Sequence, residues 1–164
     1  MRIVIWVLIA AILIVAAIPV GLMAQFSYLT VWGNNADFKS YKTEFVLVKN
    51  YVEESIPQGK QLVISKKADH FYDLYDCETK QYLNCPENIR TALQTISEKA
   101  SRSVEVSFNQ LDYVGNRIVF GVEAVGYAVV YSPDGAPYDA LGERNIERTH
   151  CKKIQKGWYH VVIY

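Results

Sequence analysis

The sequence contains, from residue 104 to residue 131, the stretch VEVSFNQLDYVGNRIVFGVEAVGYAVVY. Its first apolar residues, Val104, Val106 and Phe108, alternate with polar ones, and this period of two is typical of a strand with one buried face. Gly115-Asn116 predicts a hairpin turn between two such strands. Gly126 predicts a turn or bulge before a third strand. The stretch therefore predicts consecutive antiparallel strands.

The same pattern continues downstream. Pro133-Asp134-Gly135 is a strong turn signal, and residues 136–145 are expected to form a loop. Residues 149–154 are a candidate strand, and the turn at 155–157 leads to a strand over 158–164. We expect this strand to pair inside the sheet, because an apolar strand left at an open edge promotes aggregation.

Two faces alternate along residues 158–164. Val161 and Ile163 form an aliphatic face, which we expect to be buried. Trp158 and His160 belong to the other face, which we expect to be more open to solvent or to a partner.

Upstream of the strands, the apolar period changes to that of helices. After Asp37, a candidate N-cap, apolar residues recur at spacings of three and four, which predicts an amphipathic helix ending before Pro57. Short apolar or aromatic runs at 61–65 and 70–76 are candidate strands. A second amphipathic helix is expected to begin near Pro86-Glu87, because proline and an acidic residue both suit the first turn.

Together these elements predict an α+β domain over residues 37–164. Two amphipathic helices would pack on one face of an antiparallel β-meander of four or five strands. A chain of this length can bury a core without metal or disulfide support.

Residues 3–23 contain no charged residue and read IVIWVLIAAILIVAAIPVGLM. As a helix they would extend about 31 Å, which matches the hydrocarbon thickness of a bilayer. We therefore expect a transmembrane anchor over 1–24, in contact with lipid through 3–23, followed by an interfacial segment and linker over 25–36. Aromatic residues at both ends, such as Trp6 and Trp32, are typical of membrane interfaces.

A cleaved signal peptide is the alternative interpretation of this stretch. The apolar run is longer than most signal peptides contain, and its best cleavage site, after Ala24, has the bulky Leu22 where a small residue is favoured. For an uncleaved anchor, Arg2 and the positive-inside rule place the N-terminus in the cytoplasm and the domain outside.

The composition argues against nucleic-acid binding. The 164 residues include 17 Lys and Arg against 17 Asp and Glu, so the formal net charge is zero. No basic stripe of the kind that neutralises phosphates is present. The sequence also contains no phosphate-binding glycine loop and no metal-ligand pair such as C-x2-C, so we expect no cofactor and no metal.

The three cysteines leave several interpretations open. Cys77 and Cys85 form a candidate disulfide, which would close a short loop outside the cell. Cys85 is alternatively a reactive thiol, since the start of a helix lowers a thiol pKa. In the third interpretation, all three cysteines are unpaired and partly buried.

Cys151 and His160 form a candidate reactive pair. If residues 149–154 and 158–164 form a hairpin, the two side chains would face each other across it. Neighbouring strand residues of this kind are more often simple packing partners, so no catalytic residue is assigned.

The stretches GYAVVYSPDG (126–135) and KIQKGWYHVVIY (153–164) resemble small uncharacterised single-pass membrane-anchored proteins of Gram-positive bacteria. The resemblance covers residues 30–164 and consists of turn and strand signatures. It implies an N-terminal anchor and an external domain, and it carries no established activity. Cys151 and the spacing of Cys77 and Cys85 depart from the group.

Three function classes follow. The leading hypothesis is a membrane-tethered extracytoplasmic module that binds a protein partner, in an immunity-type or envelope-accessory role. A structural subunit that associates through small residues of its membrane helix is the second. An enzyme with a cysteine nucleophile is the third.

Overall fold

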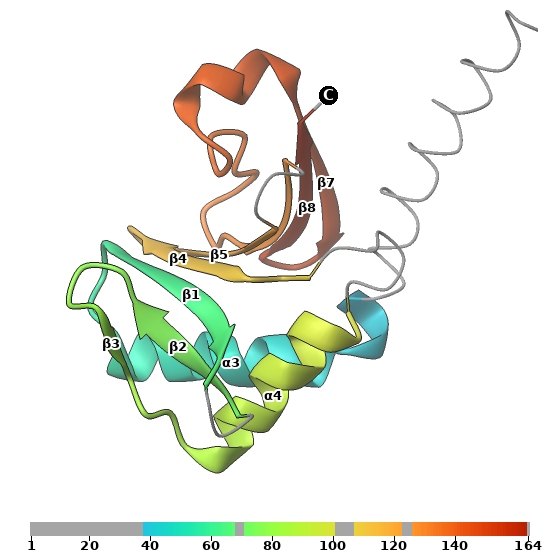
Figure 1. The fold of residues 1–164 in the computed structure, drawn as a ribbon. Helices are drawn as coiled ribbons and strands as arrows, with labels where there is room; N and C mark the ends of the chain where they lie inside the picture. Colours follow the sequence, from blue (N-terminus) through green and yellow to red (C-terminus); the bar gives the residue numbers. More distant parts are fainter. Residues whose placement is uncertain (1–37, 68–70, 101–106, 123–125, 164) are drawn as a thin grey trace, which may run out of the picture.

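The computed structural model describes residues 38–67, 71–100, 107–122 and 126–163 (Figure 1). The predicted anchor and linker lie outside these ranges, as do Asp37 and the start of the 104–131 stretch. Within the described ranges, none of the helices has the length and apolar character needed to span a bilayer.

Two helices pack on the sheet. Helix α3 (Lys42–Ser55) follows a helical turn at 38–40, and it buries Phe45, Val48 and Val52 as its apolar spacing predicts. Helix α4 (Glu87–Glu98) begins after Pro86 and has Glu87 in its first turn. Both predicted helices are confirmed.

The strands form a single antiparallel sheet in the order β3-β2-β1-β4-β5-β6-β8-β7. Their bounds are β1 (Lys60–Lys66), β2 (Tyr72–Asp76), β3 (Gln81–Tyr82), β4 (Gln110–Val114), β5 (Arg117–Val122), β6 (Tyr127–Tyr131), β7 (Thr149–Gln155) and β8 (Trp158–Ile163). The α+β class is confirmed. The expected meander of four or five strands is too small, because the runs before α4 join the same sheet through pairing of β1 with β4.

The predicted turns define the local register. Gly115 and Asn116 form a two-residue loop, and Val114 pairs with Arg117 across it. Gly115 has a φ of 61°, a conformation that glycine adopts without steric cost. The β4–β5 hairpin expected from Gly115-Asn116 is therefore present.

The sheet separates two apolar clusters. Helices α3 and α4 cover one face of the β1–β5 part, while β7 and β8 turn steeply away from it (Figure 1). The main core lies between sheet and helices, where the Phe45 ring meets Phe108 and Phe120 edge-on at centroid distances of 5.6 and 5.0 Å. A second, smaller cluster lies on the other face and contains Val119, Ala128, Val130, Tyr159 and Val161.

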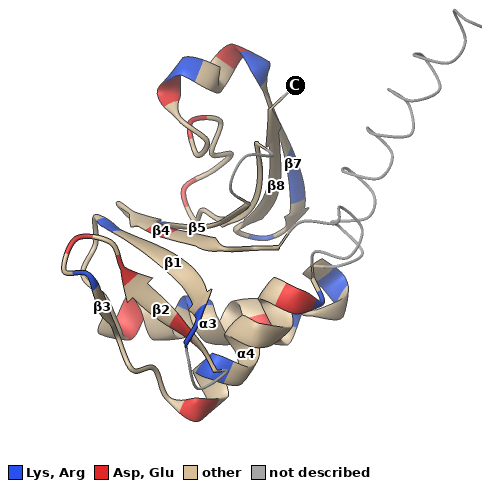
Figure 2. Ribbon diagram, viewed as in Figure 1, with Lys and Arg blue, Asp and Glu red and all other residues tan. Residues whose placement is uncertain are grey.

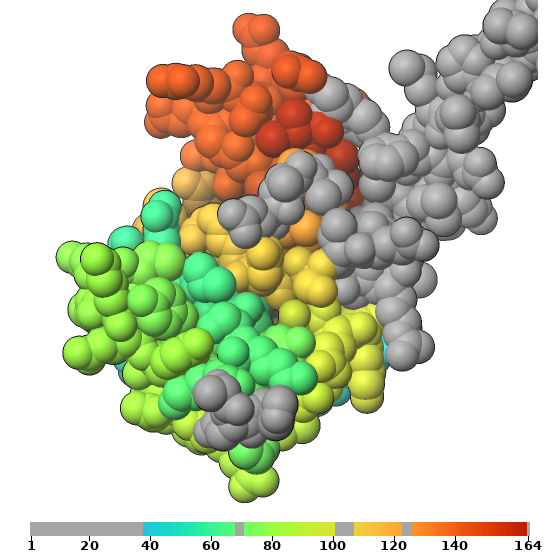
Figure 3. Space-filling model, viewed as in Figure 1, coloured from blue at the N-terminus to red at the C-terminus, as the bar shows by residue number. Residues whose placement is uncertain are grey.

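The chain from 132 to 148 supplies the cover for the second cluster. It contains the turn at Pro133-Asp134-Gly135 and the 3-10 helix η3 (Glu143–Arg148), and its residues Ala140 and Leu141 pack against that cluster. In the space-filling view, the β4–β5 hairpin lies between this chain and the β1–β3 part of the molecule (Figure 3). The predicted loop thus acts as a second layer.

Strand β8 is buried on both faces. Trp158 and Val162 belong to the main core and Val161 to the second cluster, while His160 is only 1% exposed. The expectation of an open Trp158 and His160 face is therefore wrong. Strand β8 lies between β6 and β7, with a packed layer on each side.

Strand β7 occupies one edge of the sheet. Among the described strands it pairs only with β8, and it carries Lys152 and Lys153 (Figure 2). Lysines on an edge strand discourage pairing with a second chain.

A matched pair of substitutions tests the burial of β8. We expect Val161→Ala to lower the free energy of unfolding by about 2 kcal/mol, because Val161 is fully buried. Val114→Ala, at a side chain that is 46% exposed, should change it by less than about 0.5 kcal/mol. Denaturant unfolding of both variants measures the difference. Equal effects would contradict the placement of β8.

Candidate functional site

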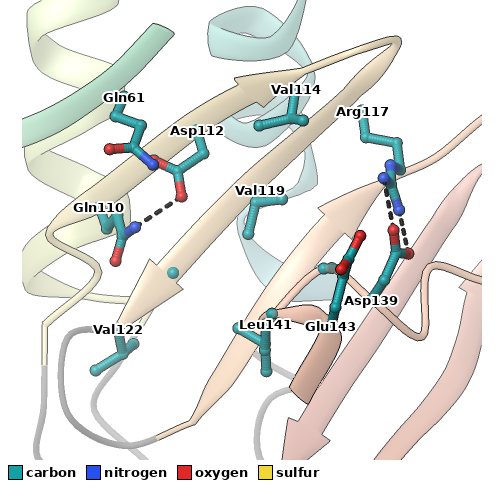
Figure 4. A pocket seen from close by; sticks show the side chains of 13 residues that line it. Gln61, Gln110, Asp112, Val114, Arg117, Val119, Val122, Asp139, Leu141 and Glu143 are labelled. Carbon is teal, nitrogen blue, oxygen red and sulfur yellow. Dashed lines mark hydrogen bonds and ion pairs between the residues drawn. The ribbon is translucent and has the colours of Figure 1, made fainter. Parts of the chain in front are cut away.

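A pocket lies on the sheet face opposite helices α3 and α4, beside the second cluster. It has a volume of about 500 Å³. One wall contains Gln61, Gln110 and Asp112 from β1 and β4, and the opposite wall contains the end of Arg117 and the chain at 139–143 (Figure 4). We call it the open-face pocket.

The floor of the open-face pocket is made of small or apolar residues of β5. Val119 and Gly121 belong to this face, because the residues that alternate with them, Ile118, Phe120 and Val122, belong to the main core. A Cβ atom on Gly121 would lie 3.5 Å from the Cβ of Gln110, and Gly121 is not among the glycines with positive φ. The backbone does not require glycine there, and its missing side chain leaves the floor open.

Asp112 lies half-buried in the wall of the pocket. Register places it between Gln61 of β1 and Val119 of β5. Its Oδ2 accepts a hydrogen bond from Nε2 of Gln110 at 2.7 Å. Its Oδ1 is shielded from solvent and accepts no hydrogen bond from the described residues. Burial raises the pKa of Asp112 above its ordinary value, against the smaller opposing effect of the Gln110 hydrogen bond.

The opposite wall contains a bidentate ion pair between Arg117 and Asp139. Nη2 of Arg117 donates to Oδ2 of Asp139 at 2.9 Å, and Nη1 donates to Oδ1. The guanidinium lowers the pKa of the Asp139 carboxyl, and the carboxylate raises the pKa of Arg117. This pair ties the start of β5 to the covering chain, with Glu143 beside it (Figure 4).

A second buried polar cluster surrounds Asp73 of β2. Its Oδ1 accepts hydrogen bonds from the backbone N–H groups of Leu74 at 2.8 Å and Cys85 at 3.1 Å. Its Oδ2 lies 3.1 Å from Nη2 of Arg90 in α4. Asp73 is fully buried, and these contacts join β2 to the beginning of α4. The cluster is therefore structural.

Cys85 does not have the lowered pKa expected of a reactive thiol. Burial raises its pKa to about 11, and its hydrogen bond with Asp73 contributes in the same direction. A nearby carboxylate and loss of solvent both disfavour the thiolate, and they outweigh any effect of the helix start. The surroundings of Cys85 therefore favour the neutral thiol, and a reactive Cys85 stays a prediction.

All three cysteines are free thiols in the structure. Cys77 is exposed in the turn after β2, Cys85 is buried, and Cys151 is half-buried in β7. The disulfide between Cys77 and Cys85 stays a prediction, which alkylation without reductant would test.

Cys151 and His160 are not brought together. Cys151 pairs with Val161 in the β7–β8 register, whereas His160 pairs with Lys152. Because successive side chains of a strand alternate between faces, the thiol and the imidazole lie on opposite sides of the sheet. Burial lowers the pKa of His160 to about 4 and raises that of Cys151 to about 11. The hairpin is present, but the expected pair is not.

Sequence reasoning did not single out Asp112, Arg117, Asp139 or Glu143. The one local signal was Asp112 itself, a charged residue between the apolar Leu111 and Tyr113 in a predicted strand region. Arg117 and Asp139 are 22 residues apart and belong to no motif. Only the fold of the covering chain brings them together.

No family model, curated protein or solved structure matches this chain. Function must therefore be inferred from the geometry of the described residues.

We expect Asp112→Asn to stabilise the domain. A buried carboxylate oxygen without a partner costs about 1–3 kcal/mol, and asparagine keeps an oxygen for Gln110 without the charge. Because the pKa of Asp112 is raised in the folded state, its ionisation lowers stability as pH rises above the ordinary carboxyl range. The gain in melting temperature should be present at pH 7 and should shrink near pH 4.

Glu54→Gln, at an exposed position of α3, is the matched control and should change the melting temperature little. Thermal melts across this pH range provide the measurement. A lower melting temperature for Asp112→Asn at pH 7 would show that the Asp112 carboxylate is a structural group.

Proposed function

We propose that this chain is a membrane-tethered extracytoplasmic module that binds a protein partner through the open-face pocket. The observation that carries the proposal is the half-buried Asp112, whose Oδ1 has no hydrogen-bond donor among the described residues. Charged groups held at a cost in stability are concentrated at functional sites.

The construction of the open-face pocket supports binding. Strands form one wall and the floor, and the opposite wall is a covering chain held by the Arg117–Asp139 ion pair. Binding residues are commonly placed in this way, on loops and strand faces held by a stable scaffold. Polar side chains at the rim and apolar ones on the floor match the usual anatomy of a ligand pocket.

The residues of the open-face pocket favour binding over nucleophilic catalysis. The described lining contains no Cys, Ser or His, so it offers no nucleophile and imidazole base of the kind used in acyl transfer. The thiol of Cys151 lies outside the pocket, near the second cluster. An enzyme with a cysteine nucleophile is consequently the weaker hypothesis.

A structural subunit that associates through residues 3–23 is the alternative. It is motivated by the alanines and glycine at 10–21, which would form a small-residue helix face. The anchor lies outside the described residues, so this alternative rests on the sequence. The immunity-type or envelope-accessory role likewise stays a hypothesis about the leading class.

The exposed Cys77 provides a test of the tether and its orientation. We expect a membrane-impermeant maleimide to label Cys77 on intact cells after brief reduction, because its thiol is exposed whereas Cys85 is buried. Cys77→Ser should remove most of the signal. Labelling that requires permeabilised cells would place the domain in the cytoplasm and contradict the proposed location.

Photo-crosslinking in native membranes tests the binding surface. A photoreactive amino acid at Val114, an exposed residue of the open-face pocket, should give a discrete protein adduct. The same amino acid at Glu54, on the exposed face of α3, is the matched control and should not. The same adduct at both positions, or none at Val114, would contradict binding through the pocket.

A further inference from the structure

We propose that the open-face pocket selects a positively charged side chain, the guanidinium of an arginine or the ammonium of a lysine, presented by the protein partner. This inference rests on the proposed function and names the chemistry of that recognition. Its evidence is the charge of the pocket, the position of Asp112 and the apolar floor.

The charge of the described lining is negative. Asp112, Asp139 and Glu143 supply three carboxylates, and Arg117 is the one Lys or Arg that the described lining contains. Arg117 donates both of its terminal nitrogens to Asp139, so these two charges offset each other. Asp112 and Glu143 then face the pocket without a cation from the described lining.

The two carboxylate oxygens of Asp112 differ in their hydrogen bonding. Oδ2 is bonded to Gln110, while Oδ1 has no donor among the described residues. The residue that pairs with Asp112 on β1 is Gln61, and it is exposed. A small displacement of the Gln61 side chain would open Oδ1 to a donor in the pocket. A charged donor would offset the cost of burying the Asp112 carboxylate.

The floor suits the aliphatic part of such a side chain. Val119 on the floor and Leu141 on the covering chain supply apolar surface in the pocket (Figure 4). Gly121 adds no side chain to the floor. Lysine and arginine place their methylene stems along apolar surface while the charged end meets polar groups. A cation reaching toward Asp112 would lie along this floor.

Other ligand classes fit less well. An anion would meet Asp112 and Glu143, and the guanidinium of Arg117 is already occupied by Asp139. A metal ion requires several ligands within a short distance, and the described residues contain no group of three or more His, Cys, Asp or Glu able to hold one. An organic cation is the remaining class with matching charge.

Methyl NMR on the full chain in detergent micelles tests the proposal. The probes are Nα-acetyl-arginine amide and Nα-acetyl-lysine amide, with the neutral Nα-acetyl-citrulline amide as the isosteric control. We expect the cationic probes to shift the methyl signals of Val114, Val119 and Leu141, which line the pocket. Val129, buried in the main core, should not respond.

Two matched variants identify the group that binds. Asp112→Asn should raise the dissociation constant of the arginine probe at least about tenfold, which corresponds to about 1.4 kcal/mol. Glu54→Gln, which also removes one carboxylate, should leave it unchanged. An unperturbed Val129 signal would show that each variant is folded.

The outcomes separate this proposal from the proposed function. Equal shifts with the citrulline probe, no shift with either cation, or unchanged binding in Asp112→Asn would overturn the selection of a cation. A photo-crosslink at Val114 that persists in Asp112→Asn would keep the pocket as the binding surface and reject the role of Asp112. Loss of that crosslink with retained probe binding would reject the protein partner and keep the cation site.

Discussion

The structure depends on covering both faces of the sheet where β5, β6 and β8 meet. Residues of these strands are apolar on each side, so neither face can be left in water. Helices α3 and α4 cover one side, and the chain from 132 to 148 covers the other with Ala140 and Leu141.

The open-face pocket lies where the second layer ends. Residues 139–143 reach β5 but leave the strands β4 and β1 uncovered on that face, so a hollow remains between them. The Arg117–Asp139 ion pair fixes the border of the cover. Because Gly121 adds no side chain, the hollow extends down to the backbone of β5. A packing requirement on one half of the sheet therefore leaves the open-face pocket on the other half.

Buried charge has two different roles in this domain. Asp73 is surrounded by backbone donors and by Arg90, so its burial is compensated and it joins β2 to α4. Asp112 is only partly compensated by Gln110, and its second oxygen has no donor among the described residues. Oδ2 of Asp73 also accepts no hydrogen bond from the described residues, but it lies 3.1 Å from the Arg90 guanidinium, whereas Oδ1 of Asp112 has no such ion-pair partner among the described residues.

The sequence by itself determined the local elements. Apolar spacings of three and four located α3 and α4, and Gly115-Asn116 located the β4–β5 hairpin, because these signals act between residues close in the chain. The strand signals were less exact: β4 begins at Gln110, after the alternating residues 104–108, and β3 was not predicted. Only the tertiary structure decided that β1 pairs with β4, that β8 is buried on both faces and that Cys151 and His160 lie apart. It also brought Arg117 to Asp139, across the pocket from Asp112. Such contacts join segments that are distant in sequence, and their free energy depends on how whole layers pack. A local sequence pattern therefore does not predict them.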